Sequence, residues 1–155
     1  MRIILILSLS VVAVGLVVLL VAPIGPLPGV FIGGSAAPIP EVWPDTSGID
    51  EIRLKAPGAI PRVVIIWVIE VEGELYVVGR KESGWTQRLD SGAPVEVRIG
   101  GSTYAVEATL VEEGAAKILM AYSAKYAPNY PEIVAGLPSI EEAPAVASIY
   151  WLDRG

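Results

Sequence analysis

Residues 95–111 read VEVRIGGSTYAVEATLV, and this stretch decides the fold of the chain. Apolar and polar residues alternate over 95–99 and again over 103–110, on either side of Gly100 and Gly101. Alternation with a period of two is typical of a strand with one buried face, and a Gly-Gly pair supplies the positive φ angles of a two-residue hairpin turn. The sequence therefore predicts a β-hairpin that turns at residues 100 and 101.

The flanking sequence extends this hairpin into a larger antiparallel domain. Residues 63–71 (VVIIWVIEV) are mostly β-branched and lead into residues 75–78 (LYVV) across a Glu-Gly-Glu turn, which predicts a second hairpin. Apolar residues then recur at helical spacing over 112–125 until Pro128, and residues 145–152 (AVASIYWL) indicate a closing strand. We expect a small, mainly antiparallel β-barrel with one covering helix.

The N-terminus carries a different signal. Residues 3–22 contain no charge, and twenty helical residues span about 30 Å, the thickness of the hydrocarbon layer. A cleaved signal is the alternative, but its apolar region is usually about 7–15 residues long, and the sequence around Ala22 is a poor cleavage site. The sequence thus predicts a single transmembrane helix. Arg2 before the span, with Arg53 as the first basic residue after it, favours a cytoplasmic N-terminus and a domain on the outer side.

Between anchor and barrel lies an uncharged stretch rich in proline and glycine. We divide the chain into an anchor (1–22), a connector (23–44) and a split-barrel-like domain (45–155). Ordinary connectors are polar, whereas this one carries Leu27, Val30, Phe31 and Ile32. We expect these four residues to contact a partner subunit or the lipid headgroup zone; the alternative is that they pack on their own domain.

Composition limits the chemistry. The chain has no cysteine and no histidine, which removes disulfides, the usual zinc sites, cysteine nucleophiles and Ser-His triads. The net charge of −6 and the absence of a large basic cluster are unfavourable for binding nucleic acid. We therefore expect no nucleic acid partner, and any chemistry has to come from carboxylates, Lys, Tyr, Ser or a bound cofactor.

Four segments together resemble a known superfamily. They are EIRLKAPG (51–58), GELYVVGRKESGWTQRL (73–89), PVEVRIGGSTYAVEATLVE (94–112) and AYSAKYAP (121–128). In this order, before the last strand, they resemble the FMN-binding split β-barrel superfamily, in particular its deazaflavin-dependent nitroreductase-like branch. The resemblance covers about two thirds of the chain, and no single one of its motifs is diagnostic. It implies a split barrel and, because relatives dimerise through the barrel, a homodimer.

The resemblance also implies where a flavin would lie. In relatives, the segment after the LYVV-like strand lies beside the flavin, and the implied cofactor cleft here consists of Arg80, Lys81, Ser83, Gly84, Trp85 and Gln87, with Arg62 as a further phosphate contact. Relatives carry a basic, Ser- and Gly-containing turn after the first strand, whereas residues 58–61 of this chain have neither a charge nor a hydroxyl. The alternative is that KESG is a solvated turn and Trp85 a core residue.

Two functions follow. The first is a single-span accessory subunit that has no cofactor and docks through its barrel to a larger membrane protein assembly. The second is a membrane-tethered reductase that binds FMN or a deazaflavin and acts on a substrate near the bilayer. The uncharged turn, the apolar connector and the anchor favour the first.

Overall fold

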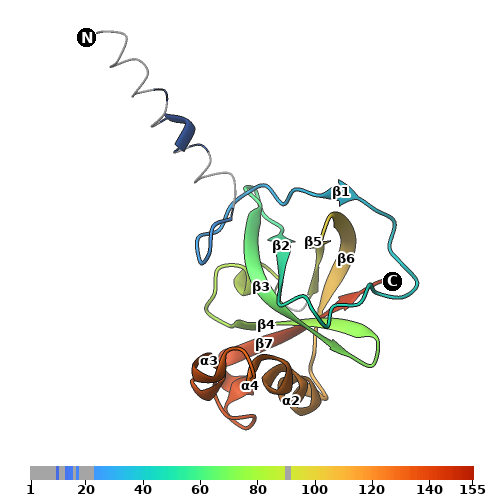
Figure 1. The fold of residues 1–155 in the computed structure, drawn as a ribbon, viewed down its shortest axis with the longest axis vertical. Coiled ribbons are helices and arrows are strands. Elements are labelled where there is room, and N and C mark those ends of the chain that lie inside the picture. Colours follow the sequence, from blue (N-terminus) through green and yellow to red (C-terminus); the bar gives the residue numbers. More distant parts are fainter. Residues whose placement is uncertain (1–9, 11–12, 16, 18–22, 90–91) are drawn as a thin grey trace.

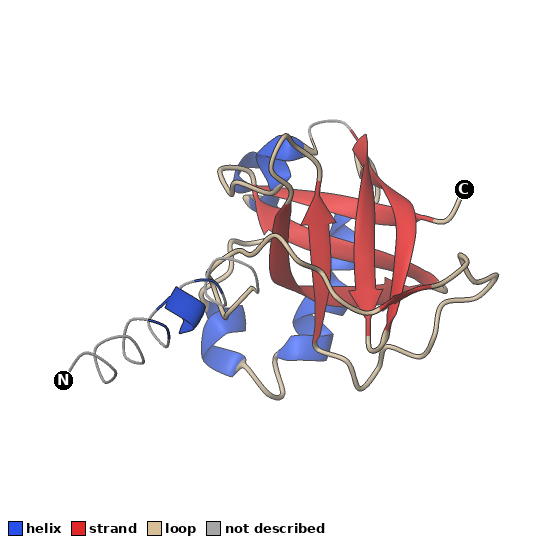
Figure 2. Ribbon diagram, turned by 90° about the horizontal axis from the view of Figure 1, so that it is seen from above, coloured by secondary structure: helices blue, strands red, loops and turns tan. Residues whose placement is uncertain are grey.

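The protein is described by a computed structural model, which covers residues 10, 13–15, 17, 23–89 and 92–155. In this part of the chain, one sheet contains the strands β1 (Ser35–Ala36), β2 (Glu51–Ala56), β3 (Arg62–Val71), β4 (Glu74–Arg80), β5 (Gly92–Ile99), β6 (Ser102–Leu110) and β7 (Ala147–Asp153). Neighbouring strands follow the order β6-β5-β2-β3-β4-β7, and β6 also pairs with β7, so the sheet closes into a barrel (Figure 2). Closure pairs strands that would otherwise be free edges.

The β5–β6 hairpin is confirmed. Ile99 pairs with Ser102 in antiparallel register, and Gly100 adopts a φ of 57°. Gly101 is not in the positive-φ region, so only the first central residue of the turn is left-handed, as in a type II′ turn. The remaining barrel pairs are also antiparallel, and only β1 runs parallel to its partner β6.

The β3–β4 hairpin is confirmed as well, with a tighter turn than the sequence indicated. Val71 pairs with Glu74, which leaves Glu72 and Gly73 as the two central residues. Both have positive φ angles, 54° and 82°. This is the pattern of a type I′ turn, whose twist matches that of the strands it joins.

A helical layer covers one side of the barrel, away from the N-terminal stretch (Figure 1). It contains α2 (Ala115–Tyr126), α3 (Pro131–Ala135) and α4 (Ala143–Val146). The sequence predicted one helix that begins at Glu112; α2 begins later because Gly114 has a φ of 78° and cannot continue a helix. The expectation of a single helix was also wrong, because α3 and α4 are too short to show an apolar period.

The end of α2 is fastened to the backbone of β3. The hydroxyl of Tyr126 accepts a hydrogen bond from the Val68 amide at 3.0 Å and lies 2.6 Å from its carbonyl oxygen. Lys125 Nζ donates to the carbonyl oxygens of Thr46, Ile49 and Val68 at 2.7 to 3.0 Å. Burial lowers the pKa of Lys125 and raises that of Tyr126. Both side chains thus satisfy backbone groups in the described fold.

Two apolar clusters hold the domain together. The first fills the barrel, with Leu54, Leu75, Leu89 and Leu152 fully buried. The second lies between the outer face of the barrel and α2, where the rings of Trp67 and Tyr126 stack at 4.1 Å between centroids. The barrel is therefore packed on its inside by its own strands and on one outer face by the helical layer.

The N-terminal region reaches the barrel before β2 begins. Gly29 and Val63 exchange backbone hydrogen bonds at 2.8 and 2.9 Å, and Trp43 is buried in the barrel cluster. Among the described residues there is no helix long and apolar enough to cross a membrane. Most of the predicted span, residues 3–22, lies outside the described residues, so that prediction stays a prediction.

Candidate functional site

The loop that follows β4 is held together by one buried hydroxyl. Thr86, the first residue of the 3-10 turn η1 (Thr86–Arg88), is only 3% exposed. Its Oγ1 lies 2.7 Å from the Arg80 carbonyl oxygen, 2.8 Å from that of Ser83 and 2.9 Å from Ser83 Oγ. The sequence analysis did not single out Thr86, because one threonine in a polar loop carries no signal of burial. The loop is thus a compact turn whose own groups satisfy one another.

Trp85 points into the barrel and is 6% exposed. Its ring packs 5.9 Å from the ring of Tyr150, measured between centroids. The ring also occupies the space next to Gly79, where a Cβ atom would lie 2.2 Å from Trp85 Cζ2. Glycine at 79 is therefore required by this close approach. The indole is a packing residue here rather than a wall on the outer surface of the loop.

Arg62 and Gly84, two residues of the implied cleft, lie together. A Cβ atom on Gly84 would lie 3.1 Å from Arg62 Cζ, so the glycine lets the guanidinium rest against the backbone of the loop. Arg62 Nε is buried and has no hydrogen-bond partner among the described residues. This arrangement places a cationic side chain against Gly84, and an anionic group would pair with such a cation.

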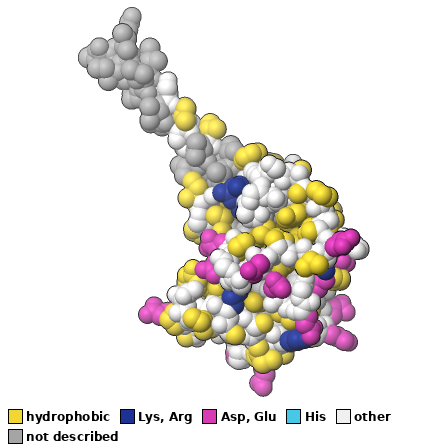
Figure 3. Space-filling view, turned by 45° about the vertical axis from the view of Figure 1, so that its right-hand side comes forward, with side chains coloured by type: hydrophobic (Ala, Val, Ile, Leu, Met, Phe, Trp, Pro, Cys, Tyr) yellow, Lys and Arg dark blue, Asp and Glu magenta, His cyan; other side chains and the backbone are white. Residues whose placement is uncertain are grey.

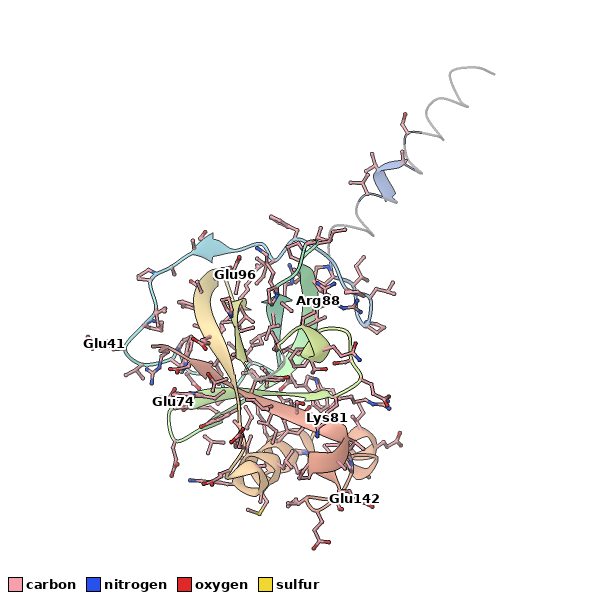
Figure 4. All side chains as sticks on the ribbon, turned by 180° about the vertical axis from the view of Figure 1, so that it is seen from behind. Glu41, Glu74, Lys81, Arg88, Glu96 and Glu142 are labelled. Atoms are coloured by element: carbon pink, nitrogen blue, oxygen red, sulfur yellow. The ribbon has the colours of Figure 1, made fainter. Side chains whose placement is uncertain are left out.

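Arg88 is a further functional candidate that sequence reasoning missed. Its Nη1 donates to the carbonyl oxygens of Ile60 at 2.7 Å and Pro57 at 3.3 Å. Figure 4 shows its side chain at the end of the barrel, near the connector. Arg88 therefore braces the uncharged turn at 57–61 against the loop. Because both contacts are with backbone oxygens distant in sequence, no motif could have revealed them.

The other predicted cleft residues face elsewhere. Lys81 Nζ donates to the Pro144 carbonyl oxygen at 2.6 Å, and its amide donates to the Val146 carbonyl oxygen, so Lys81 is joined to α4 (Figure 4). Gln87 is exposed, and Arg80 is exposed at the mouth of a pocket under the helical layer. The predicted set is therefore divided: Arg62, Ser83 and Gly84 form one group, while Arg80 and Lys81 belong to the side of the helices.

The apolar connector residues are also divided. Ile32 is buried on its own domain, and its carbonyl oxygen accepts hydrogen bonds from Arg53 and Arg98 at 3.2 and 3.3 Å. The three others remain exposed, at 56% for Leu27, 39% for Val30 and 61% for Phe31. Figure 3 shows hydrophobic side chains around the place where the N-terminal stretch joins the barrel. A partner at this end of the molecule would meet these three side chains.

Among the described residues, no group of three or more Asp, Glu, His or Cys side chains is placed to hold a metal ion. The acidic side chains are instead used locally. Lys55 pairs with Glu96 at 2.6 Å, and Lys117 pairs with Glu72 at 2.5 Å on the surface.

No protein-family model matches this chain, and no curated protein matches it. Among solved structures, the chain is similar to the conserved hypothetical protein Rv2991 from Mycobacterium tuberculosis, with a TM-score of 0.54 and 12% identity over 74% of this chain and 83% of that one. This likeness confirms the small β-barrel fold.

Two further solved structures are similar at lower TM-scores. Atu2129 from Agrobacterium tumefaciens, a protein of unknown function, has a TM-score of 0.48 and 15% sequence identity, and the match covers 68% of this chain and 49% of that chain. A NimC/NimA family protein from Clostridium acetobutylicum has a TM-score of 0.45 and 16% sequence identity, and the match covers 66% of this chain and 73% of that chain.

Proposed function

We propose that this chain is a membrane-anchored accessory subunit that docks to a larger membrane protein assembly. Its main support is the exposed apolar set Leu27, Val30 and Phe31, held in place where the chain leaves the barrel. The Gly29–Val63 bridge and the buried Ile32 hold the backbone on both sides of Val30, and Leu27 exchanges backbone hydrogen bonds with Ile24. Exposed apolar residues held in this way are typical of an interaction surface.

The cleft region gives a second line of support. A cofactor site needs polar groups that remain available, but Lys81 and Ser83 are bonded within the chain and Trp85 is in the core. Releasing them to hold a phosphate would cost the existing contacts before any new bond formed. The loop therefore suits a structural role better than a preorganised cofactor site.

The docking proposal is tested by photo-crosslinking in native membranes of the host. Phe31 is replaced by p-benzoylphenylalanine, which keeps an aromatic ring at an exposed site, and we expect irradiation to join the chain to a different membrane protein. The matched control carries the same residue at Val42, which is 75% exposed at the far end of the connector and should give no such product. A product formed only with a second copy of this chain, or no protein product, would contradict the proposal.

A second function, a flavin- or deazaflavin-dependent reductase, is favoured by Arg62. Its guanidinium rests against Gly84, and its buried Nε has no partner among the described residues. An anionic cofactor group would pair with this cation. FMN or a deazaflavin would supply hydride transfer, and the guanidinium would hold the phosphate end.

The visible spectrum of the detergent-solubilised protein separates the two functions. We expect a colourless protein that takes up no added FMN, because Lys81 and Ser83 are bonded within the chain and Trp85 is in the core. Flavin absorbance that is lost in Arg62→Gln, but retained in Arg53→Gln, would instead contradict the accessory subunit and favour the reductase. Arg53 is a suitable control because its guanidinium bonds to the connector rather than to the loop after β4.

A further inference from the structure

A pocket of about 620 Å³ lies between the barrel and the helical layer. Its base comes from the end of β4 and the start of β7, and its walls come from α2 and the segment that contains α4. The lining residues are mostly apolar, and they include Arg80, Tyr122, Ser123, Leu137, Ile140 and Val146. This volume is in the range of about 300–1,000 Å³ in which proteins bind small molecules.

The outer wall exposes large apolar side chains that the fold itself does not cover. Leu137 is 39% exposed, Ile140 41% and Val146 49%, and all three line the pocket. Pro138 and Gly136 interrupt any helix here, so the wall is an irregular segment that arches over the pocket. An apolar body in the pocket would cover these side chains and gain their burial.

The charge at the pocket is positive although the chain as a whole is acidic. Arg80 is the one charged residue among the described lining residues, and no side-chain hydrogen bond or salt bridge engages it within the described chain. The carboxylate of Glu142, on the segment of the outer wall, accepts hydrogen bonds from the amide and hydroxyl of Ser139 and lies on the outer side of the layer (Figure 4). A single anionic group at the mouth would therefore find an available cation.

Two hydroxyl groups add polarity to the wall formed by α2. Tyr122 and Ser123 both line the pocket, and their hydroxyl groups have no partner in the described structure. Burial raises the pKa of Tyr122 to about 12. Its phenol, like an ordinary tyrosine at neutral pH, is a hydrogen-bond donor.

We propose that this pocket binds an apolar carboxylate, with its hydrophobic body between α2 and the arch at 136–140 and its carboxylate on Arg80. One unpaired guanidinium suits a monoanion, whereas a phosphate dianion would call for more than one cation. The ligand site is separate from the Arg62–Gly84 group, so it does not depend on whether a flavin is bound.

Equilibrium dialysis with the detergent-solubilised full chain tests this inference. The two ligands are 2-naphthoate and its neutral isostere 2-naphthamide, and protein-free micelles are the blank. We expect 2-naphthoate to bind more tightly than 2-naphthamide. Arg80→Gln should weaken 2-naphthoate about ten-fold and leave 2-naphthamide within about two-fold, because only the carboxylate uses the guanidinium. Lys117→Gln removes a charge from the same layer outside this pocket and should change neither affinity.

A second pair of variants tests the location. Ser123→Phe fills the pocket and should weaken both ligands at least about ten-fold, whereas Ala124→Phe adds the same ring on the exposed side of α2 and should weaken neither. Far-UV circular dichroism identifies the variants that remain folded. Three results would each overturn the inference. The first is that Arg80→Gln weakens the binding of both ligands equally, and the second is that a folded Ser123→Phe variant binds them as the wild type does. The third is that the wild type does not bind 2-naphthoate at millimolar concentration.

Discussion

Trp85→Ala is expected to lower the free energy of unfolding by about 3–5 kcal/mol, the usual cost of deleting a large ring from a core. Trp85 is 6% exposed and packs against Gly79 and Tyr150 inside the barrel. Alanine would leave a cavity that the paired strands around it cannot close, because their backbones are fixed by the sheet. Urea unfolding of the detergent-solubilised chain, followed by circular dichroism, measures the change.

Gly79 provides the control for this prediction. Gly79→Ala alone should destabilise by about 1–3 kcal/mol, because its new methyl group would meet the indole. In the Trp85→Ala background the same change should cost less, since the indole is gone and only the contact of the new methyl group with Thr86 Cγ2 remains. The double variant should therefore be more stable than additivity predicts. A stable Trp85→Ala protein would show that the indole lies on the loop surface, as a cofactor wall would.

Trp43→Ala is expected to have a comparable effect, about 3–5 kcal/mol, although residue 43 belongs to the stretch that we predicted to be a connector. Trp43 is 5% exposed and makes an edge-to-face contact with Tyr104 of β6 at 5.6 Å between ring centroids. The guanidinium of Arg154 lies over its other side at 5.9 Å and bonds to the Glu41 carbonyl oxygen. The same urea titration measures the loss.

Val42→Ala is the matched control, one position away and 75% exposed. It should change stability by no more than about 0.5 kcal/mol, as most surface substitutions do. Equally small losses for the two variants would mean that this stretch is not part of the folded barrel in solution.

Patterns in short stretches of the sequence were sufficient to predict the two hairpins. The alternation around Gly100 and the β-branched run before Gly73 each determine a structure between residues close in sequence, so the pattern alone predicts them. The same holds for α2, although its start was predicted at Glu112 and the helix begins at Ala115. The short helices α3 and α4 were missed because each begins at or near a proline and is too short to show a repeated apolar face.

The candidate site was predicted less well, for a related reason. The residues of the β4 loop were identified, but a sequence does not say which way a side chain points when neighbouring positions alternate between core and solvent. The ring of Trp85 points inward because Gly79 leaves room for it. The side chain of Lys81 points to α4, where its Nζ donates to the carbonyl oxygen of Pro144. Arg88 and Thr86 were not recognised because their partners are backbone atoms of distant or irregular segments.

The sequence by itself therefore determined the strand-rich architecture, its two tight turns, the cysteine-free and histidine-free chemistry, and the apolar N-terminal signal that predicts an anchor. Only the tertiary structure decided that the stretch around Trp43 belongs to the barrel, that Arg62 meets Gly84, and that Arg80 opens on an apolar pocket. The physical reason is the distance along the chain between the residues that interact. Turns and periodic patterns depend on residues close in sequence, whereas burial and unpaired charge depend on distant segments that only the closed barrel brings together.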